Sequence, residues 1–183
     1  FDDKVTPVEE TLSAYDELIK AGKVRYIAAS NLSPARLIES FDVAEKNGLP
    51  KYVALQPHYN LVERAGFETD YASLVEKYGL SVFPYWSLAA GFLTGKYRTE
   101  ADFDKTARGG GIKKYFDEKG KAVLKALDSI SEKHEAKQAT VALAWLLAKP
   151  LITAPIVSAT SENQLETLFA APALKLDTED IKL

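Results

Sequence analysis

Helical and strand-like segments alternate along most of this chain, and that alternation limits the folds it can adopt. Strand-like runs begin at Val24, Tyr52 and Leu80, at intervals of about 28 residues. Each run follows a segment with helical periodicity and is apolar almost throughout, without in-out alternation. Continuous apolar runs are typical of parallel strands that are buried on both faces, because helices then cover each face. The pattern therefore predicts an α/β protein.

Local signals predict where the helices begin and end. The first helix is predicted to begin with Thr6 as its cap and to stop at Gly22. The second is predicted to begin with Ser33 as its cap and to stop at Gly48. Further helices are predicted near residues 68–78, at about 117–134, at about 138–148 and within 161–171.

A fourth strand is predicted at 152–158, and four strands with their helices favour one of two parallel architectures. A doubly wound sheet that binds a dinucleotide should carry Gly-x-Gly-x-x-Gly after its first strand, and no such motif follows any of the four runs. A (β/α)8 TIM barrel needs eight units. The sequence therefore predicts half a barrel, a single partial domain over 1–183 with four parallel strands, their helices and an extra helix. Its unpaired edge strands call for a missing partner half.

Composition narrows the classes of function. The net charge of -3 argues against nucleic acid or an anionic membrane as the main partner. The chain has no cysteine, and its two histidines, His58 and His134, show no metal-ligand spacing. No apolar run of about 18 residues and no basic-then-apolar leader is present, so neither a membrane span nor a signal peptide is predicted. A cytoplasmic protein is expected.

The ends of the predicted strands carry side chains suited to a flat ligand with an amide group. Barrel chemistry lies at the C-terminal ends of the strands, where this chain has Ser30 and Asn31, then Gln56, then Tyr85. A carboxamide needs both a donor and an acceptor, which the first three residues supply, and the tyrosine offers a flat face. Together they predict a nicotinamide ring lying on Tyr85.

Each of these residues also has an ordinary structural interpretation. Asn31 can belong to the turn before the Ser33 cap, as asparagine often does. Gln56 precedes Pro57 and can simply mark the end of a strand, and Tyr85 can be a core residue. The functional interpretation therefore rests on the set and not on any single member.

Four separated motifs resemble the C-terminal half of the aldo-keto reductase superfamily, in the bacterial branch that includes relatives of potassium-channel β subunits: "GKVRYIAASNLSPARL", "LQPHYNLVER", "PYWSLAAGFLTGKYR" and "PIVSATSENQLETL". The resemblance extends in order over essentially all of the chain. It implies the C-terminal half of a (β/α)8 barrel that binds NAD(P)H without a Rossmann fold and reduces aldehydes or ketones.

The resemblance also implies the contacts of the cofactor. Ser30, Asn31 and Gln56 would bind the nicotinamide carboxamide, and Tyr85 would stack on the ring. Glycines in the following loop allow phosphate to approach the backbone, and a lysine adds positive charge. A helix N-terminus at the adenosine end favours a phosphate. The further contacts are Trp86, Leu88, Gly91, Leu93, Thr94 and Lys96 along the pyrophosphate, and Ser158, Thr160 and Gln164 at the adenosine end.

The choice between NADP and NAD stays open at this point. Many relatives place a basic residue in the last segment for the 2′-phosphate of NADP, so the resemblance favours NADP, but 158–164 has no basic residue here. Arg108 offers a charge from the other side. It lies in the segment 88–116, interpreted either as a loop that covers the cofactor or, around Gly109–Gly111, as a flexible solvated stretch.

No catalytic residue is assigned. The family's catalytic Asp, Tyr, Lys and His lie on its first four strands, and "FDDKVTP" resembles the stretch about two residues beyond that His. Tyr59, Tyr85 and Tyr97 have no lysine placed beside them by strand spacing, and His58 is interpreted as a structural or rim residue. The isolated chain is therefore expected to be inactive.

Three functions compete. The first is the cofactor-binding half of an NAD(P)H-dependent aldo-keto reductase, whose partners are a small carbonyl substrate and the missing N-terminal half of the barrel. The second is a non-catalytic, β-subunit-like cofactor sensor. The third is a truncated half-barrel that dimerises through its open edges. No nucleic-acid or membrane partner is expected, and homo-oligomers are allowed.

Overall fold

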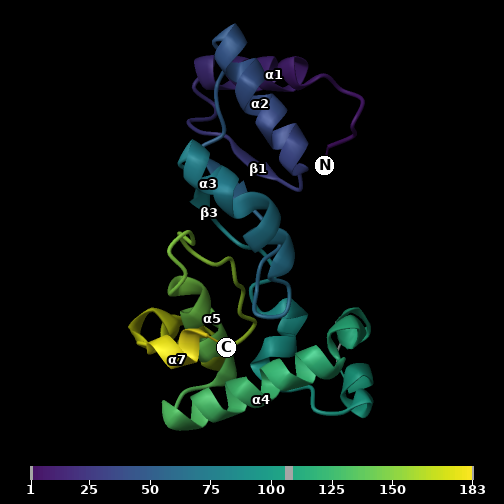
Figure 1. Ribbon diagram of the computed structural model, residues 1–183, viewed down its shortest axis with the longest axis vertical. Helices are drawn as coiled ribbons and strands as arrows, with labels where there is room; N and C mark the ends of the chain where they lie inside the picture. The colour runs from purple at the N-terminus through teal and green to yellow at the C-terminus, as the bar shows by residue number, and fades with distance from the viewer. Residues whose placement is uncertain (1, 106–108, 183) are drawn as a thin grey trace. The chain divides into compact units, whose positions relative to one another are not determined.

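The computed structural model describes residues 2–105 and 109–182, which form two compact units. Unit 1 consists of the chain up to Pro57 together with Ala65–Phe83. Unit 2 consists of His58–Arg64 together with the chain from Pro84 onwards. Figure 1 labels the elements of both units.

Unit 1 contains a parallel sheet with the strand order β1-β2-β3. The strands are β1 (Ala28–Ser30), β2 (Ala54–Gln56) and β3 (Ser81–Val82). Ser30 lies opposite Gln56 in the register of β1 and β2. The parallel strands that the apolar runs predicted are therefore present in all three of the first repeats.

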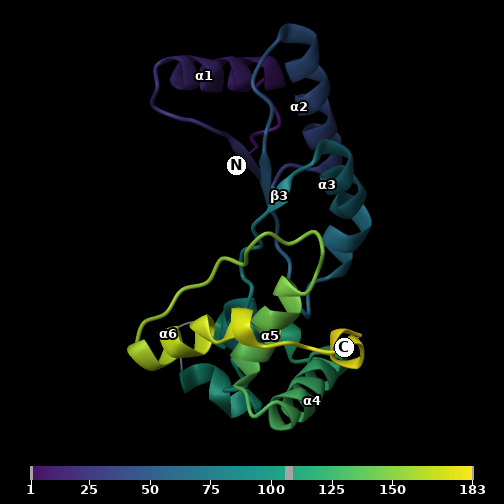
Figure 2. The same ribbon diagram turned by 90° about the vertical axis from the view of Figure 1, so that its left-hand side faces the viewer.

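The helices of unit 1 confirm the predicted positions. α2 begins after Ser33, whose Oγ accepts a hydrogen bond from the N–H of Arg36 at 3.2 Å, and it stops at Gly48 with a φ of 65°. α1 packs against α2, as both ribbon views show (Figures 1 and 2). The helices are α1 (Val8–Lys20), α2 (Pro34–Asn47), the π-helix η1 (Gly66–Tyr71) and α3 (Ala72–Tyr78).

The predicted cap of α1 is wrong. Pro7 occupies the cap position, and no side chain there accepts a hydrogen bond from the first turn. The Thr6 hydroxyl instead donates to the carboxylate of Asp3 at 2.6 Å, and this carboxylate also accepts the N–H groups of Val5 and Thr6. The Thr6 hydroxyl is therefore bonded within the turn that precedes the helix, and it does not cap the helix.

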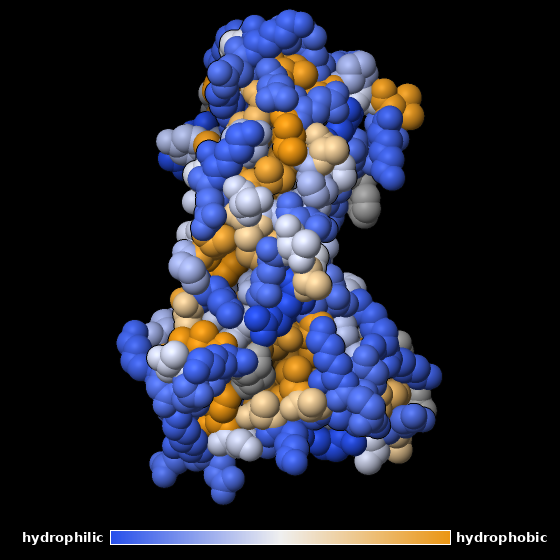
Figure 3. All heavy atoms as spheres, in the orientation of Figure 1, coloured by the Kyte–Doolittle hydropathy of each residue, from blue (hydrophilic) through white to orange (hydrophobic). Residues whose placement is uncertain are grey.

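One face of the sheet is more open than the continuous apolar runs predicted. Ala29 and Leu55 are buried, but Tyr26 is 74% exposed and Val53 is 44% exposed. Figure 3 shows hydrophobic residues reaching the surface among hydrophilic ones. Burial on both faces is therefore not realised along β1 and the residues before β2.

Unit 2 is mainly helical, and α5 is its core. Every residue from Gln138 to Leu146 is buried, and the indole N–H of Trp145 donates to the backbone oxygen of Ile181 at 3.1 Å. α4 and α6 both contact α5 (Figure 2). The α-helices are α4 (Glu118–Lys133), α5 (Gln138–Leu147), α6 (Glu162–Phe169) and α7 (Thr178–Ile181), and the 3-10 helices are η2 (Ala89–Thr94), η3 (Glu100–Lys105), η4 (Gly109–Tyr115) and η5 (Ala171–Ala173).

The predicted fourth strand at 152–158 is wrong for the described part of the chain, which contains three strands. The segment still makes one strand-like contact, because the N–H of Ile156 donates to the oxygen of Pro84 at 2.8 Å. Toward the start of the segment a parallel ladder would next need an N–H at residue 84, which Pro84 lacks, and in the other direction it would need extended backbone at Trp86, whose φ is 54°. This contact is therefore not extended into a ladder on either side.

The segment 88–116 is packed in its described part. Phe92, Phe103 and Ile112 are buried, and the ring of Phe103 meets that of Phe116 edge-on at 5.1 Å. Next to Gly109–Gly111, Ile112 is buried whereas Lys113 and Lys114 are exposed, so the interpretation of that short stretch as flexible and solvated stays a prediction. Whether the segment covers a cofactor stays a prediction.

Gly120, in the first turn of α4, leaves no room for a side chain. A Cβ there would lie 1.7 Å from the backbone oxygen of Tyr115. We expect Gly120→Ala to destabilise the complete natural protein by about 2 kcal/mol or more, because backbone atoms must move to accept the methyl group. Gly66→Ala is the matched control, since nothing lies within 4 Å of a Cβ at that helical position. Equal urea midpoints for the two variants would contradict this account.

Candidate functional site

The ends of β1 and β2 bring two of the predicted carboxamide contacts together in unit 1. The hydroxyl of Ser30 donates to the backbone oxygen of Gln56 at 3.0 Å, and both side chains are half-buried. The Ser30 oxygen can still accept a hydrogen bond, and the Gln56 side chain carries both donors and an acceptor. Asn31 follows directly, exposed and with a left-handed φ of 57°. That conformation is common for asparagine in turns and fits both interpretations of this residue.

Three rings gather in unit 2, in the residues that follow β2 and β3. His58 and Tyr85 form a parallel bridge, and their rings stack with centroids 5.4 Å apart at 15°. Trp86 meets the His58 ring edge-on at 5.2 Å and the Tyr85 ring edge-on at 6.3 Å. Tyr85 is half-buried and Trp86 is 52% exposed, so neither side chain is a core residue.

His58 supports the ring of Tyr85. Burial lowers the pKa of His58, with a smaller raising effect from Glu63 and a smaller lowering effect from Lys114. The neutral imidazole is therefore favoured at neutral pH, and this uncharged ring stacks on the ring of Tyr85. Its interpretation as a structural or rim residue agrees with this geometry.

Lys114 brings η4 to the same group of rings. Its Nζ lies 2.9 Å from Oε1 of Glu63 and 5.7 Å from the centroid of the Trp86 ring. The hydrogen bond to Glu63 is the main cause that raises the pKa of Lys114. The ammonium group is therefore retained next to the tryptophan.

Asn60, for which the sequence patterns predicted no role, has a fully buried side chain. Its Oδ1 accepts the N–H groups of Val62 and Glu63, each at 3.0 Å. Its Nδ2 donates to the backbone oxygen of Trp86 at 2.9 Å and lies 3.4 Å from Nε2 of His58. The one signal in the sequence is an asparagine between apolar and aromatic neighbours, because such a residue is buried only when it is hydrogen-bonded.

The backbone that follows Tyr85 is strained. Trp86, Ala89 and Ala90 have left-handed φ values of 54°, 49° and 56°, and Gly91 and Gly95 have φ values of 97° and 77°. Glycine adopts this conformation freely, but for the three other residues it costs about 1 kcal/mol each. Strained backbone of this kind collects at ligand-binding segments.

The same loop carries the remaining predicted pyrophosphate contacts. A Cβ at Gly91 would lie 3.2 Å from Cε and Nζ of Lys96, so the lysine folds back over this glycine. The Thr94 hydroxyl donates to the oxygen of Gly91 at 2.7 Å and closes the turn. Leu93 is fully buried and Leu88 is half-buried. The side chain of Leu93 is therefore not accessible to a ligand.

The predicted adenosine contacts lie at the start of α6. The N–H and the hydroxyl of Thr160 both donate to Oε1 of Gln164, at 2.9 and 3.1 Å. Ser161 caps the helix, since its Oγ accepts the N–H of Gln164 at 3.4 Å. Ser158 and Thr160 are exposed. The structure thus brings Thr160 and Gln164 together.

A basic residue reaches α6 from another element. Lys137, at the start of α5, donates to Oδ1 of Asn163 and to Oγ1 of Thr167, the latter at 3.1 Å. The contact is invisible in the sequence, because 26 positions separate Lys137 from Asn163. Arg108 lies outside the described residues, and its role stays a prediction.

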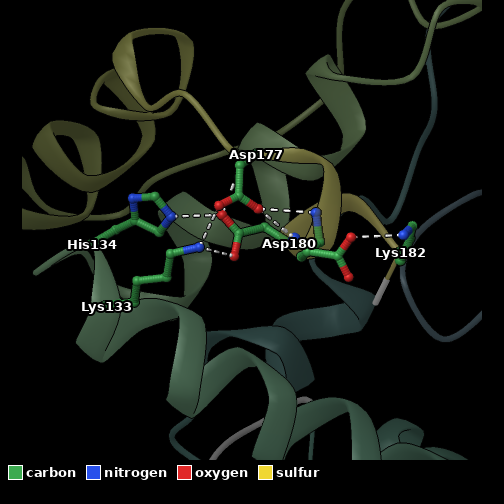
Figure 4. Close-up of polar contacts among 6 residues, drawn as sticks. Lys133, His134, Asp177, Asp180 and Lys182 are labelled. Carbon is green, nitrogen blue, oxygen red and sulfur yellow. Dashed lines mark hydrogen bonds and ion pairs between the residues drawn. The ribbon is translucent and has the colours of Figure 1, made fainter.

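A cluster of charged groups ties α4 to α7 (Figure 4). Nζ of Lys133 lies 2.6 Å from Asp177 and 2.8 Å from Asp180, and Nε2 of His134 lies 2.7 Å from Asp180. Burial alone would raise the pKa of Asp180, but hydrogen bonds from Lys133, His134 and the N–H of Asp177 outweigh it and lower the pKa to about 2. The cluster fastens the end of the described chain.

We expect low pH to weaken the contacts that attach α7 to α4. The folded pKa of Asp180 lies below an unfolded value of about 4, so its stabilisation is present above about pH 4 and is lost as the pH falls toward 2. The protection of the α7 amides, which is the intrinsic exchange rate divided by the observed rate at the same pH, should therefore fall between pH 5 and pH 2.5. Asp180→Asn should lower this protection at pH 5 and remove most of its pH dependence, whereas the exposed Asp42→Asn should change neither. Wild-type protection that stays constant over this range would contradict the account.

Within the described ranges 2–105 and 109–182, no helix is long and apolar enough to cross a membrane. No group of three or more His, Asp or Glu side chains there is arranged to hold a metal ion.

Comparison with known proteins places these features in context. The model of the family described as the Aldo/keto reductase family matches residues 1–183. The chain is 32% identical over 181 residues to an uncharacterized oxidoreductase, YrpG, of Bacillus subtilis (strain 168). It is 31% identical over 180 residues to the protein tas of Escherichia coli (strain K12). These alignments cover 99% and 94% of this chain but 54% and 50% of the two relatives, so the chain spans about half the length of each.

A solved structure gives the same result. The thermostable aldo-keto reductase Tm1743, in complex with the inhibitor epalrestat, matches with a TM-score of 0.72 and 28% identity. The match covers 97% of this chain and 53% of that one. The α/β arrangement of parallel strands and helices is therefore similar to that of an aldo-keto reductase.

Proposed function

Because the chain belongs to the aldo/keto reductase family, we propose that it supplies the cofactor-binding half of an NAD(P)H-dependent oxidoreductase that reduces aldehyde or ketone carbonyls to alcohols. It would form the C-terminal half of a (β/α)8 barrel, and the catalytic Asp, Tyr, Lys and His would come from the other half. The match to about half of each relative supports this division.

The observation that carries the proposal is the left-handed backbone at Trp86, Ala89, Ala90 and Gly91, directly after the ring of Tyr85. Ala89, Ala90 and Gly91 are left-handed in succession, and strained backbone of this kind collects at ligand-binding segments. Lys96, folded over Gly91, adds a positive charge at the same place. A dinucleotide needs this combination, a flat ring face followed by a site for its pyrophosphate.

The side chains of this chain would bind and orient the cofactor. Tyr85 would hold the nicotinamide ring flat, with His58 stacked against the tyrosine. Ser30, Asn31 and Gln56 would bond the carboxamide and so fix which face of the ring meets the substrate. The reduced cofactor supplies the hydride, and the proton would come from a tyrosine of the other half.

Lys137 bears on the choice between the two nicotinamide cofactors. Its ammonium group contacts Asn163 in the first turn of α6, beside the proposed adenosine contacts. A positive charge there favours the 2′-phosphate and hence NADP. Titration of the complete natural protein with NADPH and NADH would test this preference.

We expect Tyr85→Ala to weaken NADPH binding to the complete natural protein by about tenfold, because a stacked ring of this kind contributes about 1 kcal/mol or more. Quenching of protein fluorescence during an NADPH titration measures the affinity. Tyr15→Ala, which removes a half-buried ring from α1, is the matched control and should leave the affinity unchanged. Equal affinities for wild type and Tyr85→Ala would remove the stacking role.

Turnover separates the enzyme from the cofactor sensor. The complete natural protein should oxidise NADPH in the presence of small aldehydes, whereas the isolated chain should not, because its proton donor would be absent. Tight NADPH binding by the complete protein without reduction of any aldehyde would favour the sensor.

A further inference from the structure

Two buried polar side chains bond the segment that carries the rings of Tyr85 and Trp86. We call these two residues the proposed nicotinamide platform. We propose that Asn60 and Ser87 are positioning residues, which set Tyr85 and Trp86 in the conformation that binds the cofactor. The inference rests on the proposed function of this segment and adds to it a pair of residues that do not themselves contact the ligand.

The hydrogen-bond partners of the Asn60 carboxamide determine its orientation. Its oxygen accepts the N–H groups of Val62 and Glu63, so the NH2 group must face the opposite way. That group meets the backbone oxygen of Trp86 at 2.9 Å and Nε2 of His58 at 3.4 Å. One buried amide therefore links the turn after β2 to the backbone of the platform.

Ser87 holds the platform from the other side. Its side chain is 1% exposed, and its Oγ lies 3.0 Å from the backbone oxygens of both Pro84 and Ile156. The single hydroxyl hydrogen is shared between these two acceptors. The segment 152–158, which leads to the proposed adenosine contacts, is thereby tied to the segment that carries the aromatic rings.

The two contacts account for the strained conformation between them. Trp86 is a bulky residue with a left-handed φ of 54°, and such a residue keeps this conformation only where its surroundings over-determine it. Asn60 bonds the carbonyl of Trp86, and Ser87 anchors the next residue along the chain. Without them the segment would relax toward an ordinary φ, and the ring of Tyr85 would lose its fixed position.

The consequence for binding is preorganisation. A loop that is already held in its bound form loses less conformational entropy when the ligand arrives, and its affinity is correspondingly higher. A residue with this role affects the nicotinamide and pyrophosphate end of the cofactor more than the adenosine end. A residue that only stabilises the fold would affect binding of both ends equally.

Asn60→Asp isolates the contact to Trp86. The new carboxylate keeps an oxygen for the N–H groups of Val62 and Glu63 but replaces the donor that faces the carbonyl of Trp86. We expect the complete natural protein with this change to bind NADPH about tenfold more weakly at pH 8. Affinity relative to wild type should recover at pH 5.5, because a protonated carboxyl donates a hydrogen bond again and burial raises its pKa. Asn47→Asp, at the exposed end of α2, is the matched control.

Ser87→Ala tests the second contact and decides the question if Asn60→Asp does not fold. It should weaken NADPH binding about fivefold to tenfold, because the carbonyl of Ile156 loses this donor and the carbonyl of Pro84 keeps only the N–H of Ile156. Ser129→Ala removes an exposed hydroxyl that donates within α4 and is the matched control. Binding of 2′,5′-ADP, which contains only the adenosine end, should stay within about twofold of wild type in Asn60→Asp.

The outcomes separate this inference from the proposed function. If the wild-type protein binds neither NADPH nor NADH, the proposed function fails. If the wild type binds NADPH and the folded variants bind it equally well, the positioning role fails while the proposed function stands. Equal losses of NADPH and 2′,5′-ADP affinity in Asn60→Asp would likewise overturn the positioning role, because they indicate a general loss of structure.

Discussion

Parallel pairing places the end of one strand level with the end of the next, and the proposed carboxamide contacts depend on it. In unit 1 the register sets Ser30 opposite Gln56, where the serine hydroxyl bonds the main chain of its neighbour. The strands are only two or three residues long, so this end of the sheet depends on a few hydrogen bonds. Apolar residues such as Leu55 and Ala29 bury the strands behind the polar ends.

Unit 2 contains a strained loop that must be kept in one conformation. Three residues other than glycine between Trp86 and Ala90 have left-handed backbone, which has a conformational cost. Buried polar contacts from Asn60 and Ser87 on this segment offset that cost, and the ring of His58 supports Tyr85. A loop held in this way, with Lys96 folded over Gly91, suits a ligand that carries negatively charged phosphates.

Local signals in the sequence predicted most of the helices well. The Ser33 cap and the glycine stop at Gly48 work as predicted, because each requires only residues within one or two turns. The Thr6 cap failed because a nearer carboxylate, that of Asp3, took the hydroxyl. The strand predicted at 152–158 failed because an apolar run does not reveal that it meets Pro84, which has no N–H, and Trp86, whose backbone is left-handed.

The sequence by itself determined the α/β class, the three parallel strands, the positions of the helices and the family, because periodicity, caps and motifs are written along the chain. Tertiary structure alone decided that Asn60 reaches Trp86, that Ser87 reaches Ile156 and that Lys137 reaches α6. These contacts join residues 26 or more positions apart. No local pattern encodes them, since the hydrogen-bond partner of a buried polar group is chosen by the folded backbone around it.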